Sequence, residues 1–174
     1  MKKLSTKRLC RAGVIAALYA ALTYAFAPVA FGPFQLRPAE ALCILPLFFP
    51  EAIPALWIGC MLSNLFSPFF LYDVVFGALA TLLAATCTYF IGKKLDHAPL
   101  KILFGGFFPV IFNTLIIPFI IVFLCGGDAG YESAWIAYAL NALSIFATEA
   151  VFVYGLGTPL YFAIEKLIHK QKQA

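Results

Sequence analysis

Long apolar runs with very few charges are the feature that most constrains the fold of this chain. Of its 174 residues, 63% are hydrophobic and only 11% are charged. In soluble globular domains the apolar share is about 45–50%, and so few charged side chains could not cover this much apolar surface in water. The sequence therefore predicts an all-α membrane protein, in which lipid surrounds most of the surface.

The apolar runs predict six transmembrane helices within one integral membrane domain, residues 1–174. A helix needs ~20 apolar residues to cross the hydrocarbon core. The region 41–67 is apolar but contains three prolines and Glu51, which favours two short helices that turn at Pro50–Glu51. The last span is long, and a break is expected near Gly155, Gly157 and Pro159. The predicted spans are residues 12–31, 40–50, 52–67, 73–92, 101–125 and 134–164.

Basic residues predict the orientation of these spans, because cytoplasmic loops are enriched in Lys and Arg. With a turn at Pro50–Glu51, eleven of the twelve basic residues fall on one side of the membrane, and Arg37 alone faces out. Both termini are therefore predicted to be cytoplasmic, and no cleavable leader is expected. The basic clusters are Lys2, Lys3, Lys7, Arg8 and Arg11; Lys93, Lys94 and Lys101; and Lys166, Lys170 and Lys172.

Enzymatic chemistry is not expected from this sequence. It contains no Gly-rich phosphate loop that ends in Lys-Ser or Lys-Thr, so the chain should not itself hydrolyse ATP by a P-loop. The five cysteines are scattered without a C-x-x-C pair, and the two histidines, His97 and His169, lie in polar segments. We therefore predict no catalytic residues, no metal site, no cofactor and no nucleic-acid partner.

Polar side chains inside the predicted spans are the candidate functional residues, because an ionisable group at mid-membrane costs at least ~2.5–3.5 kcal/mol. Glu149 lies in the middle of the last span, and Asn141 lies ~12 Å before it on the same helix face. Asn64, Asn113 and Asp73 are further candidates. For these three a structural role is an open alternative: the asparagines could bond a neighbouring helix, and Asp73 could be a helix N-cap.

The segment GPFQLRPAEAL, residues 32–42, places Gln35, Arg37 and Glu40 in an outer loop between two apolar runs. We expect this loop to cover a pocket that Asn141, Glu149 and Asn113 line from beneath. Carboxylates and amides suit a ligand with several N–H donors and a carbonyl, such as a purine-like base. Alternatively, Arg37 and Glu40 pair only to stabilise the loop. Glu51 is expected to be solvated or to meet a partner subunit.

Small residues recur every four positions in the first span. Ala12, Ala16 and Ala20 form one row, beside a parallel row that contains Gly13 and Ala17. Small side chains let another helix approach closely, and close packing drives helix association in lipid. Within the bundle this row needs only a neighbouring helix, whereas a lipid-exposed row indicates a partner protein.

Four segments resemble the queuosine-precursor transporter family. They are GPFQLRPAEAL (32–42), IPALWIGCMLSNL (53–65), DVVFGALATLLAA (73–85) and LNALSIFATEAVFVYGLGTPLY (140–161), and the resemblance runs over residues 12–161. A six-helix protein with an Ala-x-x-x-Ala first helix is also similar to the substrate-binding S component of an energy-coupling factor (ECF) transporter. This resemblance implies an S-component-like bundle in the bacterial cytoplasmic membrane.

The resemblance also implies a ligand and partners. The ligand would be a 7-deazaguanine precursor of the tRNA base queuosine, such as pre-queuosine, and the partners a transmembrane T component and two cytoplasmic ATPase subunits. Glu40 and Glu149 would then accept the ring N–H groups or an aminomethyl cation, and Asn141 and Gln35 would read the carbonyl and the remaining edge. Arg37 would hold the loop shut by pairing with Glu40, and the row of Ala12, Ala16 and Ala20 would dock on the T component.

Three readings of the function remain open at this point. A binding subunit of an ATP-driven importer is favoured, for this ligand or for another vitamin. A stand-alone secondary carrier of a purine-like base is the alternative. An intramembrane enzyme is a distant third, because no nucleophile–base pair lies within the predicted spans.

Overall fold

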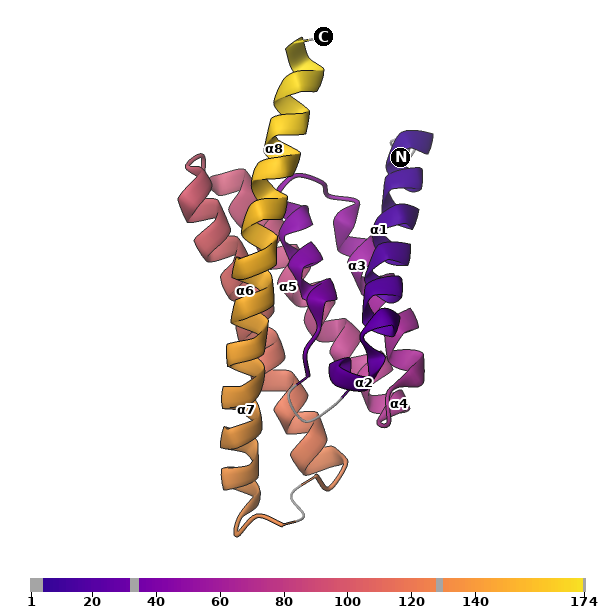
Figure 1. Ribbon diagram of the computed structural model, residues 1–174, viewed down its shortest axis with the longest axis vertical. Coiled ribbons are helices and arrows are strands. Elements are labelled where there is room, and N and C mark those ends of the chain that lie inside the picture. The colour runs from indigo at the N-terminus through magenta and orange to yellow at the C-terminus, as the bar shows by residue number, and fades with distance from the viewer. Residues whose placement is uncertain (1–4, 32–34, 128–129, 174) are drawn as a thin grey trace.

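The computed structural model describes residues 5–31, 35–127 and 130–173, and the regular structure in these ranges is helical throughout (Figure 1). The first half of the chain contains α1 (Thr6–Ala25), α2 (Ala27–Ala30), η1 (Pro38–Leu47), α3 (Ala52–Ser63) and η2 (Asn64–Phe66). The second half contains α4 (Phe70–Tyr72), η3 (Asp73–Gly77), α5 (Ala78–Lys94), α6 (Ala98–Phe119), η4 (Ile120–Leu124), α7 (Ala134–Ala150), η5 (Val151–Leu156) and α8 (Gly157–Gln173). The predicted all-helical class is confirmed.

Three of the helices are long and apolar enough to cross a bilayer. They are the continuous stretches Phe70–Lys94, Ala98–Leu124 and Ala134–Gln171. Two shorter apolar helices, Pro38–Leu47 and Ala52–Phe66, are joined by a turn at residues 48–51. The described chain is thus a membrane protein by length and composition, and a count of six crossings stays a prediction.

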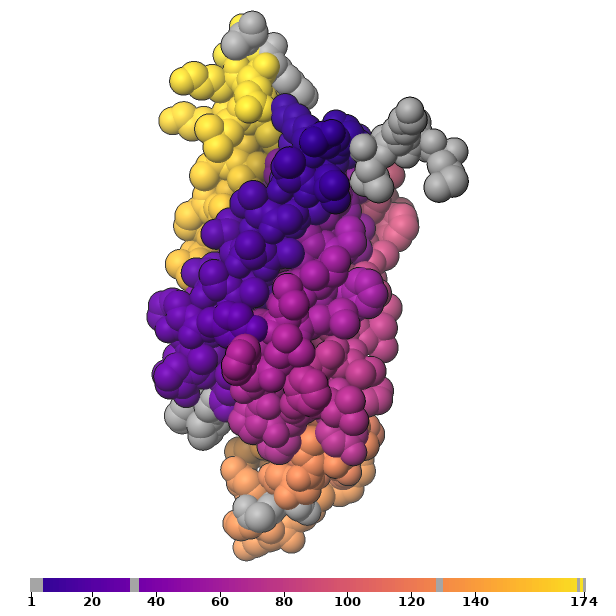
Figure 2. All heavy atoms as spheres, turned by 90° about the vertical axis from the view of Figure 1, so that its right-hand side faces the viewer, coloured from indigo at the N-terminus to yellow at the C-terminus, as the bar shows by residue number. Residues whose placement is uncertain are grey.

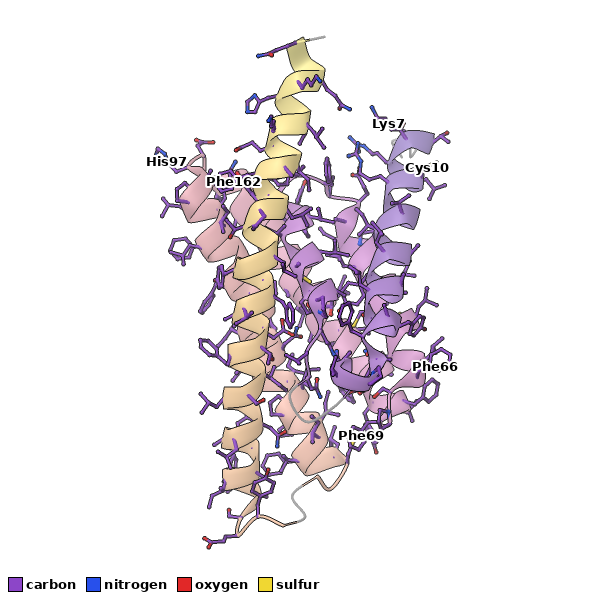
Figure 3. All side chains as sticks on the ribbon, in the orientation of Figure 1. Lys7, Cys10, Phe66, Phe69, His97 and Phe162 are labelled. Carbon is purple, nitrogen blue, oxygen red and sulfur yellow. The ribbon has the colours of Figure 1, made fainter. Side chains whose placement is uncertain are left out.

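Both ends of the described chain lie at the same end of the bundle (Figure 1). Lys7 and Cys10 near the start of α1 share that end with His97, which precedes α6, whereas Phe66 and Phe69 lie toward the other end (Figure 3). The described residues of the three basic clusters belong to segments at this end, so the charge asymmetry seen in the sequence is also present in the described structure. Which side of the membrane this end faces stays a prediction.

The segment η1 forms the centre of the bundle. It is a 3₁₀ helix of ten residues, and nine of them, Ala39–Leu47, are buried. Such a long 3₁₀ helix is unusual, and here it begins at Pro38 and contains Pro46. It packs against α1, α5, α6, α8 and η5.

Two glycines let the neighbouring helices approach η1. A β-carbon at Gly92 of α5 would lie 2.7 Å from the Leu47 carbonyl oxygen, and one at Gly105 of α6 would lie 2.9 Å from the Leu47 side chain. Both distances are shorter than a van der Waals contact. At Gly92 the close atom belongs to the backbone of η1, so a larger residue would displace this segment, whereas at Gly105 the end of the Leu47 side chain could move aside. The two glycines thus bring α5 and α6 close to the end of η1 at Leu47.

The last helix is continuous from Ala134 to Gln173, so the break expected near Gly155–Pro159 is wrong. A π-helical segment, Val151–Leu156, stands in its place. Proline lacks the N–H that would bond the carbonyl four residues earlier. A π turn changes the hydrogen-bond register just before Pro159, and the helix passes the proline without ending.

Glu51 is buried rather than solvated, so the first of the two expectations for it is wrong, whereas contact with a partner subunit stays a prediction. Its carboxylate is buried and accepts a hydrogen bond from Arg11 Nη1 over 2.9 Å. The Arg11 guanidinium also lies 4.0 Å from the centre of the Phe49 ring. The ion pair therefore ties the turn between η1 and α3 to the first helix.

The small-residue row of α1 faces α3 within the bundle. A β-carbon at Gly59 of α3 would lie 3.0 Å from the Ala16 carbonyl oxygen, so the two backbones are in close contact. Ala20 is buried, whereas Ala12 and Ala16 are half-buried. Figure 2 shows α1 and α3 side by side on this face of the molecule. The small-residue row of α1 therefore contributes to helix packing within the chain.

Candidate functional site

Glu40 lies in the first turn of η1, where it is only 1% exposed. Both of its carboxylate oxygens accept hydrogen bonds: Oε1 from the Tyr19 hydroxyl of α1, and Oε2 from the Cys43 thiol at 3.0 Å. In a 3₁₀ helix residues three apart stand one above the other, so Cys43 lies directly over Glu40. Glu40 is held rigidly by groups from two elements.

Arg37 precedes η1 and is also buried. Its Nε donates to the Ala30 carbonyl oxygen over 3.3 Å, and its guanidinium lies 5.5 Å from the centre of the Phe31 ring. Nη2 has no hydrogen-bond partner among the described residues. The predicted ion pair between Arg37 and Glu40 is wrong for this structure, because Glu40 is engaged by Tyr19 and Cys43 instead.

Glu149 lies in α7, close to the start of η5, and is 5% exposed. Asn113 of α6 donates from Nδ2 to Glu149 Oε1 over 2.9 Å. The other carboxylate oxygen, Oε2, is buried and has no partner among the described residues. Glu149 lies within electrostatic range of both Glu40 and Arg37, so the groups on η1 and α7 belong to one charged region.

Asp73 and Asn64 form the adjoining part of this region. The Ser67 hydroxyl donates to the Asp73 carboxylate, and Asn64 Nδ2 donates to the Asp73 carbonyl oxygen over 2.9 Å. Asp73 Oδ1 and Asn64 Oδ1 lack partners among the residues described. Asp73 lies near enough to Arg37 for an electrostatic interaction, although the two form no ion pair. The buried polar cluster thus consists of Arg37, Glu40, Asn64, Asp73, Asn113 and Glu149.

Asp73 is not a helix N-cap, which was the alternative explanation for it. The continuous helix begins at Phe70, and the Asp73 backbone N–H already donates to the Phe69 carbonyl oxygen. The carboxylate is buried at 2% exposure and accepts from a side chain, Ser67. A buried carboxylate of this kind is expensive in lipid and indicates a functional region.

A comparison with known families gives a match over most of the chain. The model of the family described as "QueT transporter" matches residues 9–166, a range that contains every member of the cluster. The chain belongs to the QueT transporter family. The resemblance noted in four sequence segments is therefore confirmed.

A curated relative of this QueT-family chain is the "Queuosine precursor transporter QueT" of Lactococcus lactis subsp. cremoris (strain MG1363). It is 39% identical over 84 residues, which is 47% of this chain and 49% of that protein. The aligned region thus spans about half of the length of the relative. No solved structure matches the chain.

Two of the predicted site residues make no hydrogen bond to the two glutamates of the cluster in the described part of this QueT-family structure. Asn141 is half-buried, and its Nδ2 donates to the Ala137 carbonyl oxygen of its own helix over 2.8 Å. Gln35 lies in the loop before Arg37 with φ of 47°, in the left-handed region that few non-glycine residues adopt. No hydrogen bond among the described residues connects either side chain to Glu40 or Glu149.

Sequence reasoning missed three residues that position the carboxylates: Tyr19, Cys43 and Ser67. Cys43 follows Glu40 by three residues, a spacing that the 3₁₀ conformation of η1 turns into a direct contact. The only sequence signal for Tyr19 is a phenol among the small residues of α1, and a buried Tyr hydroxyl usually has a polar partner.

Proposed function

We propose that the chain is the membrane substrate-binding subunit, or S component, of an ATP-driven ECF-type importer, and that it captures a 7-deazaguanine precursor of queuosine. Membership of the QueT transporter family and the name of the Lactococcus relative support a transported queuosine precursor. The observation that carries the residue-level proposal is a pair of buried atoms, Glu149 Oε2 and Arg37 Nη2, that lack partners among the described residues.

These two atoms have opposite hydrogen-bonding character. Glu149 Oε2 can only accept when the carboxylate is ionised, and Arg37 Nη2 can only donate. A 7-deazaguanine ring presents a ring N–H next to a carbonyl along one edge. In the proposed complex, Glu149 accepts from the N–H edge and Arg37 donates to the carbonyl, while Asn113 fixes the Glu149 carboxylate by its bond to Oε1.

The charge of the cluster favours a cationic ligand. Three carboxylates, Glu40, Asp73 and Glu149, are buried in the cluster together with one guanidinium, that of Arg37. Unpaired buried charges are costly, and a bound cation would compensate the excess of carboxylates. We therefore infer that the aminomethyl form of the ring, which carries a positive charge, suits this cluster better than an uncharged form.

Transport would depend on partner subunits. The sequence has no P-loop, so a T component and two cytoplasmic ATPases are proposed to supply the energy. Ala12 and Ala16 remain half-exposed on α1 and are the residues we propose for docking on the T component, whereas Ala20 is buried within the chain. The proposed setting is the bacterial cytoplasmic membrane, with six crossings and both termini inside.

Calorimetry with the purified protein tests the ligand assignment. Wild-type protein should bind 7-aminomethyl-7-deazaguanine, and Glu149→Gln should weaken binding by about 10- to 100-fold, since a hydrogen bond to a charged group is worth about 1.5–3 kcal/mol. Glu132→Gln is the matched control, because Glu132 is an exposed carboxylate that precedes α7. No binding to wild type, or equal binding by both variants, would overturn the proposal.

A further inference from the structure

A groove lies on the outside of the bundle, and none of the residues of the polar cluster lines it. It has a volume of about 620 Å³ and runs between α1 and α3. Its walls are apolar, with Leu9, Ala12, Ala16, Pro54 and Ile58 among them, while Arg8 and Glu51 are the charged residues that line it. It follows α1 from Arg8 to Ala16, about 12 Å at 1.5 Å per residue.

A second groove meets the first at Arg8. It has a volume of about 430 Å³ and lies between the start of α1, the turn at residues 48–51 and the end of α8. Arg11, Phe48 and Gln171 contribute to its walls. Arg8, Pro50 and Glu51 line both grooves, so a polar hollow continues directly into an apolar one.

Arg8 is the uncompensated charge at this junction. Glu51 is paired with Arg11, and no described carboxylate lies within ion-pair distance of the exposed Arg8 guanidinium. The surrounding end of the bundle is strongly basic, because nine of the ten basic residues in the described ranges belong to its segments but only three of the seven acidic residues in those ranges do. An anionic group therefore complements this junction.

We propose that the two grooves together bind one anionic phospholipid. The phosphate group lies against Arg8 in the polar groove, and one acyl chain lies along the apolar groove between α1 and α3. Basic pockets between membrane helices at the cytoplasmic side bind anionic headgroups, and the apolar continuation distinguishes a lipid from a free phosphate. Ala12 and Ala16 line the groove, so a membrane protein that docked there would displace the chain.

Native mass spectrometry of the purified protein tests this site with dioleoyl phosphatidylglycerol and dioleoyl phosphatidylcholine as probes. Wild type should retain phosphatidylglycerol in preference to phosphatidylcholine. Arg8→Ala should reduce that retention about fivefold, the effect of one basic residue at an anionic surface. Lys94→Ala is the matched control, since Lys94 is a basic residue of the same end that lines neither groove.

A second pair of variants tests the acyl chain. A β-carbon at Gly13 meets no atom within 4 Å, so Gly13→Leu should fill the groove without disturbing the bundle and should reduce lipid retention. Ala17→Leu, one turn further on the exposed side of α1, should leave lipid retention unchanged.

Three results would each overturn the proposal: equal retention of the two lipids by wild type, equal loss of retention in Arg8→Ala and Lys94→Ala, or full retention in Gly13→Leu. If wild type and Gly13→Leu bound glycerol 3-phosphate equally well, the site would be a phosphate site that does not hold a lipid.

Discussion

Asn113 on α6 and Glu149 on α7 are joined by a hydrogen bond of 2.9 Å, although 36 residues separate them in the sequence. Both side chains are buried. The bond satisfies one oxygen of the carboxylate and orients the other, Oε2, which has no partner among the described residues. One amide thus decides which atom of Glu149 is available to a ligand.

Asn113→Ala should lower both stability and ligand affinity. The substitution leaves Glu149 Oε1 buried without its donor, which costs about 1–3 kcal/mol, and it frees the carboxylate to rotate. Asn141→Ala is the control, because Asn141 bonds only its own helix. Thermal unfolding in detergent and calorimetric titration measure the two effects. A larger loss of affinity in Asn141→Ala than in Asn113→Ala would contradict this assignment.

Tyr19→Phe should destabilise the protein by about 1–3 kcal/mol, because it removes the donor to Glu40 Oε1 and leaves that buried oxygen without this hydrogen bond. Tyr138→Phe removes a more exposed hydroxyl, which donates to the Leu115 carbonyl oxygen over 3.3 Å, and should have little effect. The melting temperatures of the two variants in the same detergent give the comparison. Equal melting temperatures would show that the Tyr19–Glu40 contact does not support the fold.

Gly92→Ala should reduce stability by about 1–3 kcal/mol, the range for overpacking of a close contact. The new β-carbon would lie 2.7 Å from the Leu47 carbonyl oxygen, and a backbone atom cannot move aside without displacing η1. Gly155→Ala is the matched control in the membrane-spanning part, because a β-carbon there meets no atom within 4 Å. The measurements are the yield of folded protein by size-exclusion chromatography and the melting temperature. If Gly92→Ala changed neither, the close packing of α5 on η1 would be contradicted.

Uptake by the chain alone distinguishes an importer subunit from a stand-alone carrier. Proteoliposomes that contain only this protein should bind labelled 7-aminomethyl-7-deazaguanine without accumulating it, since no ATP-hydrolysing loop is present in the sequence. Addition of a T component and its ATPases, with ATP, should produce uptake. Accumulation by the chain alone under an ion gradient would favour the secondary carrier instead.

The sequence by itself determined that lipid surrounds most of the protein surface and that the fold is helical. Its apolar runs are too long and too poorly charged for a water-soluble core, and the described structure is helical throughout. The sequence also identified most of the buried polar residues, because a charged or amide side chain in an apolar run has a high cost wherever it lies. The family resemblance could be read from four segments and is confirmed by the match over residues 9–166.

Only the tertiary structure decided how these residues are connected. The sequence suggested Arg37 as the partner of Glu40, whereas the structure places Tyr19 and Cys43 there. Periodicity along one helix shows which residues share a face, but it does not show which helix lies opposite or how close it comes. Those distances depend on η1, whose buried 3₁₀ conformation and contacts with Gly92 and Gly105 arise from packing between segments far apart in the chain.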